Sequence, residues 1–241
     1  MTMEALTDGT IVVSSPQSGM QYSLNGGEKQ AVTTDAINVN AGDKVAFYGN
    51  GTSIDSYYGT RIYGGTADVK VYGNIMSLVN ENSFVTATSV QEDAFRDLFW
   101  GNDHILDASG LLLPATSLRS QCYEGMFRVC SKMTAAPAEL PATSLNVDCY
   151  KEMFSNCDAL TTAPELRAKT LATCCYQRMF YSCDNLTSLT CLATNLGNWV
   201  NRQEWLYGIT TSGTLYVDGS MTGEDWFVPT TWTVKSVAEK P

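Results

Sequence analysis

Apolar residues recur at fixed intervals in the middle of the chain. The pattern Cys-Tyr-x-x-Met-Phe-x-x-Cys begins at Cys122, Cys149 and Cys175, so its copies are 27 and 26 residues apart. A degenerate copy precedes them over residues 95–105. Self-similarity at such a period indicates a repeat architecture, in which each unit buries its apolar face against its neighbours.

Within one copy, apolar residues lie four positions apart. Cys149, Met153 and Cys157 are at i, i+4 and i+8, and Tyr150 and Phe154 each follow by one residue. Residues three or four apart share one face of an α-helix. The spacing therefore predicts a two-turn helix, and these side chains are interpreted as core.

The segments between copies are similar to the strand of a leucine-rich repeat. Leu186, Leu189 and Cys191 fit Leu-x-x-Leu-x-Leu with Cys in the last place. Over residues 95–191 the copies resemble the BspA-like leucine-rich repeats of bacterial surface proteins, with Met-Phe in place of the usual Ala-Phe. The resemblance implies a curved solenoid with strands on one side and short helices on the other. It also implies adhesion or binding at a cell surface, and it supplies no catalytic residues.

Residues 1–80 alternate between apolar and polar over short segments. Asn25-Gly26 predicts a hairpin, because both central residues of such a turn need positive φ. Strands at intervals of about ten residues with Gly-rich turns are typical of a small sandwich or barrel. The expected strands cover residues 10–13, 21–24, 36–39, 44–48 and 68–72.

The repeat pattern disappears after Asn195, and tryptophan becomes frequent. Bulky aromatic residues at the end of a repeat array are suited to a cap that shields the last unit. Four of the five tryptophans lie in this segment, at Trp199, Trp205, Trp226 and Trp232, and residues 214–217 and 232–234 are its expected strands. We therefore predict an α+β fold with an N-terminal all-β sandwich (residues 1–80), a leucine-rich-repeat solenoid of about four repeats (81–194) and a C-terminal β/Trp-rich cap (195–241).

Composition and charge narrow the classes of partner. With 44% hydrophobic and 17% charged residues, the chain is typical of a folded protein. The net charge is −10, so no basic surface is expected for nucleic acid. No apolar run approaches the ~18 residues of a membrane span, so we expect no membrane insertion.

The sequence leaves two cellular locations open, the cytoplasm and the cell surface or exterior. The first residues, Met1–Leu6, lack the basic start and long apolar stretch of a signal peptide, which alone indicates a cytoplasmic protein. A surface protein without its leader would look the same, and the resemblance implies a cell-surface or secreted location.

The eight cysteines are interpreted as small apolar core residues. On one helix, Cys149 and Cys157 would be about 12 Å apart, farther than the ~7 Å that a disulfide spans. Bridges between copies are possible, although a column of three cysteines leaves one unpaired. Zinc is the alternative, but adjacent Cys174 and Cys175 and the lone His104 lack the usual ligand spacing.

No catalytic constellation is found. His104 stands beside no Gly-rich elbow, and the acidic residues are scattered. We therefore expect a protein that is not an enzyme, with no cofactor and no metal.

Three sets of residues are candidates for binding, and for each the alternative is an ordinary solvent-exposed surface without a ligand. The strand-side set is Thr134, Ala135, Thr161, Thr162, Thr187 and Ser188. The helix-side set, which varies between copies, is Glu124, Arg128, Lys151, Ser155, Arg178 and Tyr181. The third set is the tyrosines of a Gly-bounded loop, Tyr57, Tyr58 and Tyr63.

These observations favour a non-catalytic binding or adhesion module of a bacterial surface or secreted protein. Its expected partner is a host or bacterial surface protein or a glycan. The alternative is a structural spacer or fibre segment of a larger surface or phage-tail assembly. A binder differs from a spacer in carrying a contiguous exposed apolar or aromatic patch. The ligand and the oligomeric state stay open.

Overall fold

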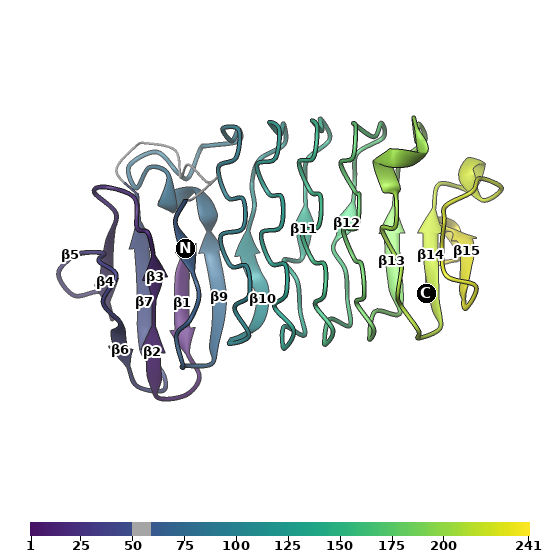
Figure 1. The fold of residues 1–241 in the computed structure, drawn as a ribbon. Helices are drawn as coiled ribbons and strands as arrows, with labels where there is room; N and C mark the ends of the chain where they lie inside the picture. The colour runs from purple at the N-terminus through teal and green to yellow at the C-terminus, as the bar shows by residue number, and fades with distance from the viewer. Residues whose placement is uncertain (50–58) are drawn as a thin grey trace.

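The molecule is built mostly of strands and turns. The computed structural model describes residues 1–49 and 59–241. All four helices in this part of the chain are 3-10 helices of three or four residues. Figure 1 shows the N-terminal strands at one end and successive layers of backbone extending to the C-terminus at the other. The predicted α+β fold with a helix-bearing leucine-rich-repeat solenoid is therefore wrong, and the fold class is mostly β.

The N-terminal strands form one six-stranded sheet and two two-stranded sheets. The main sheet has the order β10-β9-β1-β7-β4-β5, β2 pairs with β6, and β3 pairs with β8. The elements are β1 (Thr2–Ala5), β2 (Gly9–Ile11), β3 (Val13–Ser14), β4 (Gln21–Leu24), β5 (Gln30–Ala31), β6 (Ile37–Val39), β7 (Lys44–Tyr48), β8 (Arg61–Ile62), β9 (Val69–Asn74) and η1 (Ile75–Leu78), followed by β10 (Ile105–Leu112).

Local sequence explains these strands. In β7, Val45 and Phe47 are buried and alternate with partly exposed neighbours, as expected for a strand with one face on the core. Between β4 and β5, Asn25 and Gly26 have φ of 53° and 73°, which is the backbone that the hairpin turn requires. The strands expected at 21–24 and 44–48 are confirmed, as is the hairpin turn expected at Asn25-Gly26, which connects β4 to β5.

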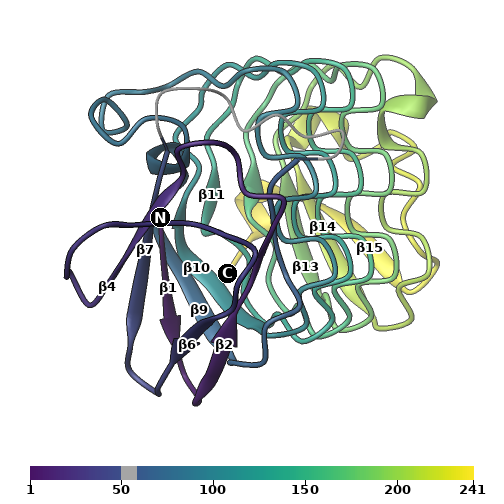
Figure 2. The same cartoon turned by 60° about the vertical axis from the view of Figure 1, so that its left-hand side comes forward.

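The main sheet does not end with the N-terminal strands. β10 pairs in parallel with β9, with Ile105 opposite Val69 and Leu112 opposite Asn74. The expected sandwich over residues 1–80 is therefore replaced by a mixed sheet that continues past residue 80. Buried apolar residues from Met1 to Trp232 form one cluster. Figure 2 shows the later layers of the chain directly behind the N-terminal strands.

The C-terminal half carries a second sheet, of five parallel strands. Its order is β11-β12-β13-β14-β15, so strands of successive segments lie side by side. The elements are β11 (Glu139–Leu140), β12 (Glu165–Leu166), β13 (Ser188–Cys191), η2 (Trp199–Arg202), β14 (Gly213–Val217), η3 (Gly219–Met221), β15 (Trp232–Ser236) and η4 (Val237–Glu239). The strands expected at 214–217 and 232–234 are confirmed as β14 and β15.

The Cys-Tyr-x-x-Met-Phe-x-x-Cys segments form turns instead of the predicted helices. We call residues 94–102, 122–130, 149–157 and 175–183 rungs one to four. Alternate amides pair with the next rung: the N–H of Tyr123 donates to the carbonyl of Cys149 at 3.0 Å, and the N–H of Phe127 donates to Met153 at 2.9 Å. The amides between them bond locally, as Met126 does to Tyr123 at 3.3 Å. Because half of the donors point to a neighbouring copy, the i→i−4 ladder of an α-helix cannot form.

A left-handed residue at every fourth position gives each rung its shape. In rung two these residues are Gln121, Gly125 and Val129, with φ of 56°, 59° and 62°. Rung three repeats the arrangement at Asp148, Glu152 and Asn156. A turn that recurs every four residues places i, i+4 and i+8 on one side, so the apolar spacing is real although the element is not a helix.

Stacked aromatic rings fill the interior between rungs. One column runs Phe95–Tyr123–Tyr150–Tyr176–Trp205–Trp226, with centroid separations of 5.6, 5.7, 6.3, 6.4 and 5.8 Å. The other runs Phe99–Phe127–Phe154–Phe180, with separations of 5.2, 5.6 and 5.4 Å. All of these rings are buried, so the interpretation of the repeat aromatics as core is confirmed.

Candidate functional site

A fifth rung, residues 201–208, ends the stack. Amides of rung four donate to it in the same alternating way: Tyr176 to Asn201, Arg178 to Gln203, Phe180 to Trp205 and Ser182 to Tyr207, at 2.9, 2.9, 2.8 and 2.8 Å. Because the repeat motif is absent here, the sequence pattern did not reveal this rung. A signal was nevertheless present, since Gln203 and Tyr207 repeat Gln177 and Tyr181 at the 26-residue period.

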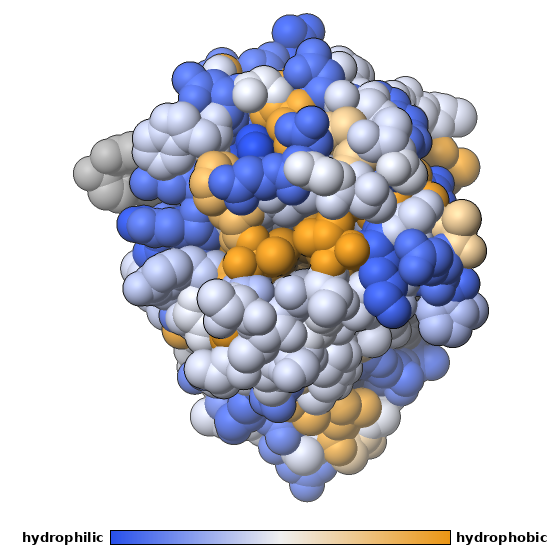
Figure 3. Space-filling view, turned by 90° about the vertical axis from the view of Figure 1, so that its right-hand side faces the viewer, coloured by the Kyte–Doolittle hydropathy of each residue, from blue (hydrophilic) through white to orange (hydrophobic). Residues whose placement is uncertain are grey.

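The outer side of the fifth rung is only partly covered. Trp226 stacks on Trp205 at 5.8 Å, and the indole N–H of Trp205 donates to the carbonyl of Trp226 at 2.7 Å. Beside this contact a groove of about 520 Å³ opens to solvent. It is lined by Trp199, Gln203, Glu204, Leu206, Tyr207, Gly208, Phe227, Val228, Pro229 and Thr230. Figure 3 shows hydrophobic surface gathered in a hollow at this end of the molecule.

Three aromatic side chains of the groove are exposed. Trp199 is 53% exposed, Tyr207 62% and Phe227 44%. The aromatic rings of the columns are buried, so exposure at this end is a local feature. Large aromatic residues gathered in a solvent-open hollow mark an interaction site more often than an ordinary surface.

Known proteins provide no match to this chain. Comparison found no matching family model, curated protein or solved structure. The resemblance to BspA-like repeats therefore stays a prediction, and a functional proposal depends on the side chains of the groove.

The polar groups of the groove are held by rung four. The amide Nε2 of Gln177 donates to Oε1 of Gln203 at 2.7 Å. The guanidinium Nε of Arg178 donates to Oε2 of Glu204 at 2.7 Å. Each pair joins residues at equivalent positions of two rungs, so Gln203 and Glu204 each have a protein partner without a ligand.

Neighbouring side chains also fix the aromatic groups. Tyr207 stacks on Tyr181 with centroids 5.6 Å apart. Phe227 lies over the guanidinium of Arg202 at 5.1 Å and has φ of 50°, a conformation that bulky residues rarely adopt. Backbone strain of this kind persists where surrounding contacts hold it.

Arg202 forms the support beneath Phe227. It is 7% exposed, and its Nη2 donates to the carbonyl of Asp225 at 2.9 Å. Burial lowers the pKa of Arg202, although Asp225 and Glu224 act in the opposite direction. Its Nε and Nη1 have no hydrogen-bond partner among the described residues. Arg202 follows Tyr176 by one 26-residue period, but Trp205 takes the place in the ring column, and Arg202 packs against the Phe227 ring instead.

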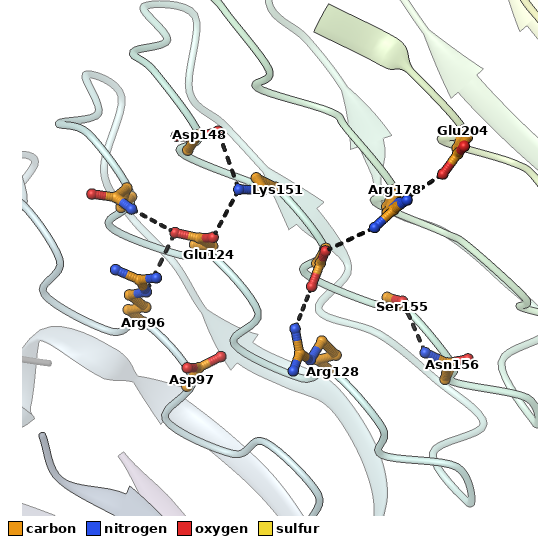
Figure 4. Close-up of polar contacts among 12 residues, drawn as sticks. Arg96, Asp97, Glu124, Arg128, Asp148, Lys151, Ser155, Asn156, Arg178 and Glu204 are labelled. Carbon is orange, nitrogen blue, oxygen red and sulfur yellow. Dashed lines mark hydrogen bonds and ion pairs between the residues drawn. The ribbon is translucent and has the colours of Figure 1, made fainter. Parts of the chain in front are cut away.

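The charged residues of the predicted helix-side set pair with one another across rungs (Figure 4). Glu124 contacts Arg96 and Lys151, each at 3.3 Å. Arg128 and Arg178 both contact Glu152. Arg178 then reaches Glu204 of the groove, as described above. Since these opposite charges pair with one another, we interpret this series of ion pairs as a structural feature of the surface, and not as a binding site. The series ends at the groove.

The strand-side residues follow one another along neighbouring layers, and the hydroxyls of Thr134 and Thr161 are used in bonds between layers. The hydroxyl of Thr134 donates to the carbonyl of Leu106 at 3.0 Å, and that of Thr161 donates to the carbonyl of Thr134 at 3.2 Å. Ala135 and Thr162 form a parallel bridge. Thr187 and Ser188 continue this surface towards β14, where Ser188 pairs with Thr214.

The tyrosine set stands apart from the groove. Tyr57 and Tyr58 lie outside the described residues. Tyr63 follows β8 in the N-terminal region and is 41% exposed. No contact joins Tyr63 to the strand-side set in the described part of the chain. Its role in binding stays a prediction.

Cysteine and histidine show no arrangement for metal or nucleophilic chemistry in the described residues. All eight cysteines are free, and all but Cys174 are buried. The thiols of Cys157 and Cys183 donate to the carbonyls of Phe127 and Phe154 at 3.1 and 3.0 Å. His104 is hydrogen-bonded through Nδ1 to Asp68 at 2.8 Å. Across residues 1–49 and 59–241, no group of three His, Cys, Asp or Glu side chains could hold a metal ion.

None of the helices that the structure describes is long and apolar enough to cross a membrane.

Proposed function

We propose that this protein is a non-catalytic binding module whose ligand site is the groove of the fifth rung. The observation that carries the proposal is the exposure of Trp199, Tyr207 and Phe227 around one hollow of about 520 Å³. Small-ligand pockets have volumes of about 300–1,000 Å³ and combine apolar walls with a few oriented polar groups. Gln203 and Glu204 provide such groups.

The lining of the groove favours binding over catalysis. Among the described residues that line it, Glu204 is the only charged one, and it is ion-paired with Arg178. Acid–base hydrolysis of a glycoside uses two carboxyl groups on opposite sides of the substrate. A nucleophile with an adjacent base is not found among the lining residues either. We therefore favour adhesion or capture, at a bacterial surface or in a secreted protein, as the role.

A binding array with matched variants tests this proposal. The full chain is applied to immobilised matrix proteins, peptides and glycans, together with a groove variant, Tyr207→Ala with Phe227→Ala, and a control, Tyr63→Ala. Tyr207→Ala and Tyr63→Ala each remove the side chain of an exposed tyrosine, but only Tyr207 lies in the groove. We expect signals that the groove variant loses and the control keeps. Signals that survive in the groove variant would place binding elsewhere on the chain, and no signal from the wild-type chain would favour the structural spacer.

A further inference from the structure

We infer that the groove takes a short neutral oligosaccharide, with pyranose rings lying on its aromatic side chains. This inference rests on the proposed binding function. Trp199, Tyr207 and Phe227 contribute exposed aromatic rings to the lining of the hollow, from η2, the fifth rung and the loop before β15. The negative face of an aromatic ring attracts the weakly positive C–H groups that a pyranose presents on its apolar face.

The polar groups match sugar hydroxyls better than a peptide backbone. A carboxylate such as Glu204 only accepts hydrogen bonds, and one of its oxygens is taken by Arg178. Its other oxygen can accept from a hydroxyl donor. A polyproline helix, which also binds aromatic grooves, presents carbonyl acceptors and lacks N–H donors. Glu204 would therefore face an acceptor in that complex and a donor in a sugar complex.

Charge favours a neutral sugar over an acidic one. The described residues that line the groove include Glu204 and no lysine or arginine. Arg202 lies nearby, but it is covered by Phe227 and directed to the carbonyl of Asp225. The chain carries a net charge of −10, which repels uronic and sialic acids further. A neutral oligosaccharide avoids the cost of bringing two like charges together.

The fixed side chains lower the ordering cost of binding. Tyr207 stacks on Tyr181, Gln203 is held by Gln177, and Glu204 is held by Arg178. Side chains that are already ordered lose little conformational freedom when the ligand arrives. The site therefore suits a ligand whose own contacts are individually weak, as the stacking of a sugar ring is.

Titration of tryptophan fluorescence and heat with defined probes tests the inference. The probes are cellotriose, chitotriose, mannotriose and maltotriose, with trigalacturonic acid as the acidic probe and decaproline as the peptide probe. We expect saturable binding of at least one neutral trisaccharide at millimolar or lower concentration. Affinity should fall about tenfold or more in Tyr207→Ala and in Phe227→Ala, since each removes apolar area equivalent to more than 1.4 kcal/mol. Tyr63→Ala should bind as the wild type does.

The outcomes separate this inference from the proposed function. If none of the four neutral sugars binds, or if binding is unchanged in both groove variants, the oligosaccharide inference is overturned. Decaproline or trigalacturonic acid binding that depends on Tyr207 would also overturn it, while the groove would remain a binding site. Sedimentation of the wild type as a dimer that the groove variants lose would show that a second copy occupies the groove. Circular dichroism and thermal melting of each variant exclude misfolding as the cause of lost binding.

Discussion

Val129 holds a backbone conformation that β-branched residues avoid. Its φ is 62°, and its side chain is 36% exposed. The left-handed region costs an ordinary L-residue about 1–2 kcal/mol, and asparagine tolerates it better. Asn156 fills the same place in the next rung, with φ of 58°. We expect Val129→Asn to raise the free energy of unfolding by about 1 kcal/mol, measured by urea denaturation.

Val147 provides the matched control. It is 41% exposed, and its φ is not positive. Val147→Asn replaces the same side chain at a similar exposure without relieving left-handed strain. We expect it to leave stability unchanged or slightly lower. Equal effects of the two substitutions would show that side-chain polarity, rather than backbone conformation, sets the result.

At the scale of the element, a rung is a unit that only its neighbours complete. Alternate amides of a rung donate hydrogen bonds to carbonyls of the next rung. In the other direction, the thiols of Cys157 and Cys183 donate to carbonyls of the rung that precedes each of them. Burial raises the pKa of Cys149 to about 12, so its thiolate is scarce at neutral pH. Cys174 differs, because it is the one cysteine that is not buried.

Thiol labelling tests this account of the rungs. We expect Ellman's reagent to modify one thiol in the native chain and eight in urea, because seven thiols are both buried and protonated. Cys174→Ser should abolish the native signal without changing the total gained on unfolding. Rapid native labelling of several thiols would contradict the packing of the rungs described above.

The sequence predicted part of this structure correctly. Local alternation was sufficient for β4 and β7, and the spacing of Met153 and Phe154 identified core residues. The helix prediction failed because α-helices and four-residue turns share the same apolar spacing, and hydrogen bonds to a neighbouring copy distinguish them. The groove was missed because Trp199 and Phe227 meet only through the folded end of the chain.

At the scale of the molecule, the N-terminal sheet and the rungs share one core. β10 belongs to the main sheet and also contacts the next layer, where the N–H of Ala108 donates to the carbonyl of Ala135 at 2.9 Å. Buried residues of both regions belong to the same cluster. The main sheet and the core therefore include residues on both sides of position 80, and we expect the two regions to unfold together.

Tryptophan fluorescence can report this coupling, because all five tryptophans lie at position 100 or later. We expect Phe47→Ala, which empties a buried site in β7, to cost about 3–5 kcal/mol. It should shift the tryptophan transition and the far-ultraviolet circular dichroism transition together. Leu6→Ala, at a side chain that is 42% exposed, is the control and should shift neither by more than about 0.5 kcal/mol. A tryptophan transition unmoved by Phe47→Ala would show two independent domains.

The number of stacked copies sets the distance between the N-terminal sheet and the C-terminal groove. Each full copy of 26 or 27 residues adds one layer that is hydrogen-bonded to the next, and neighbouring strands of a β ladder lie about 4.8 Å apart. Duplicating or deleting one inner copy would move the C-terminal groove away from or towards the N-terminal sheet by that step. The side chains that line the groove would be untouched, because they belong to η2, the fifth rung and the loop before β15. The distance of the groove from the N-terminal sheet and the residues that line the groove are thus encoded in separate stretches of this chain, and the two can vary independently.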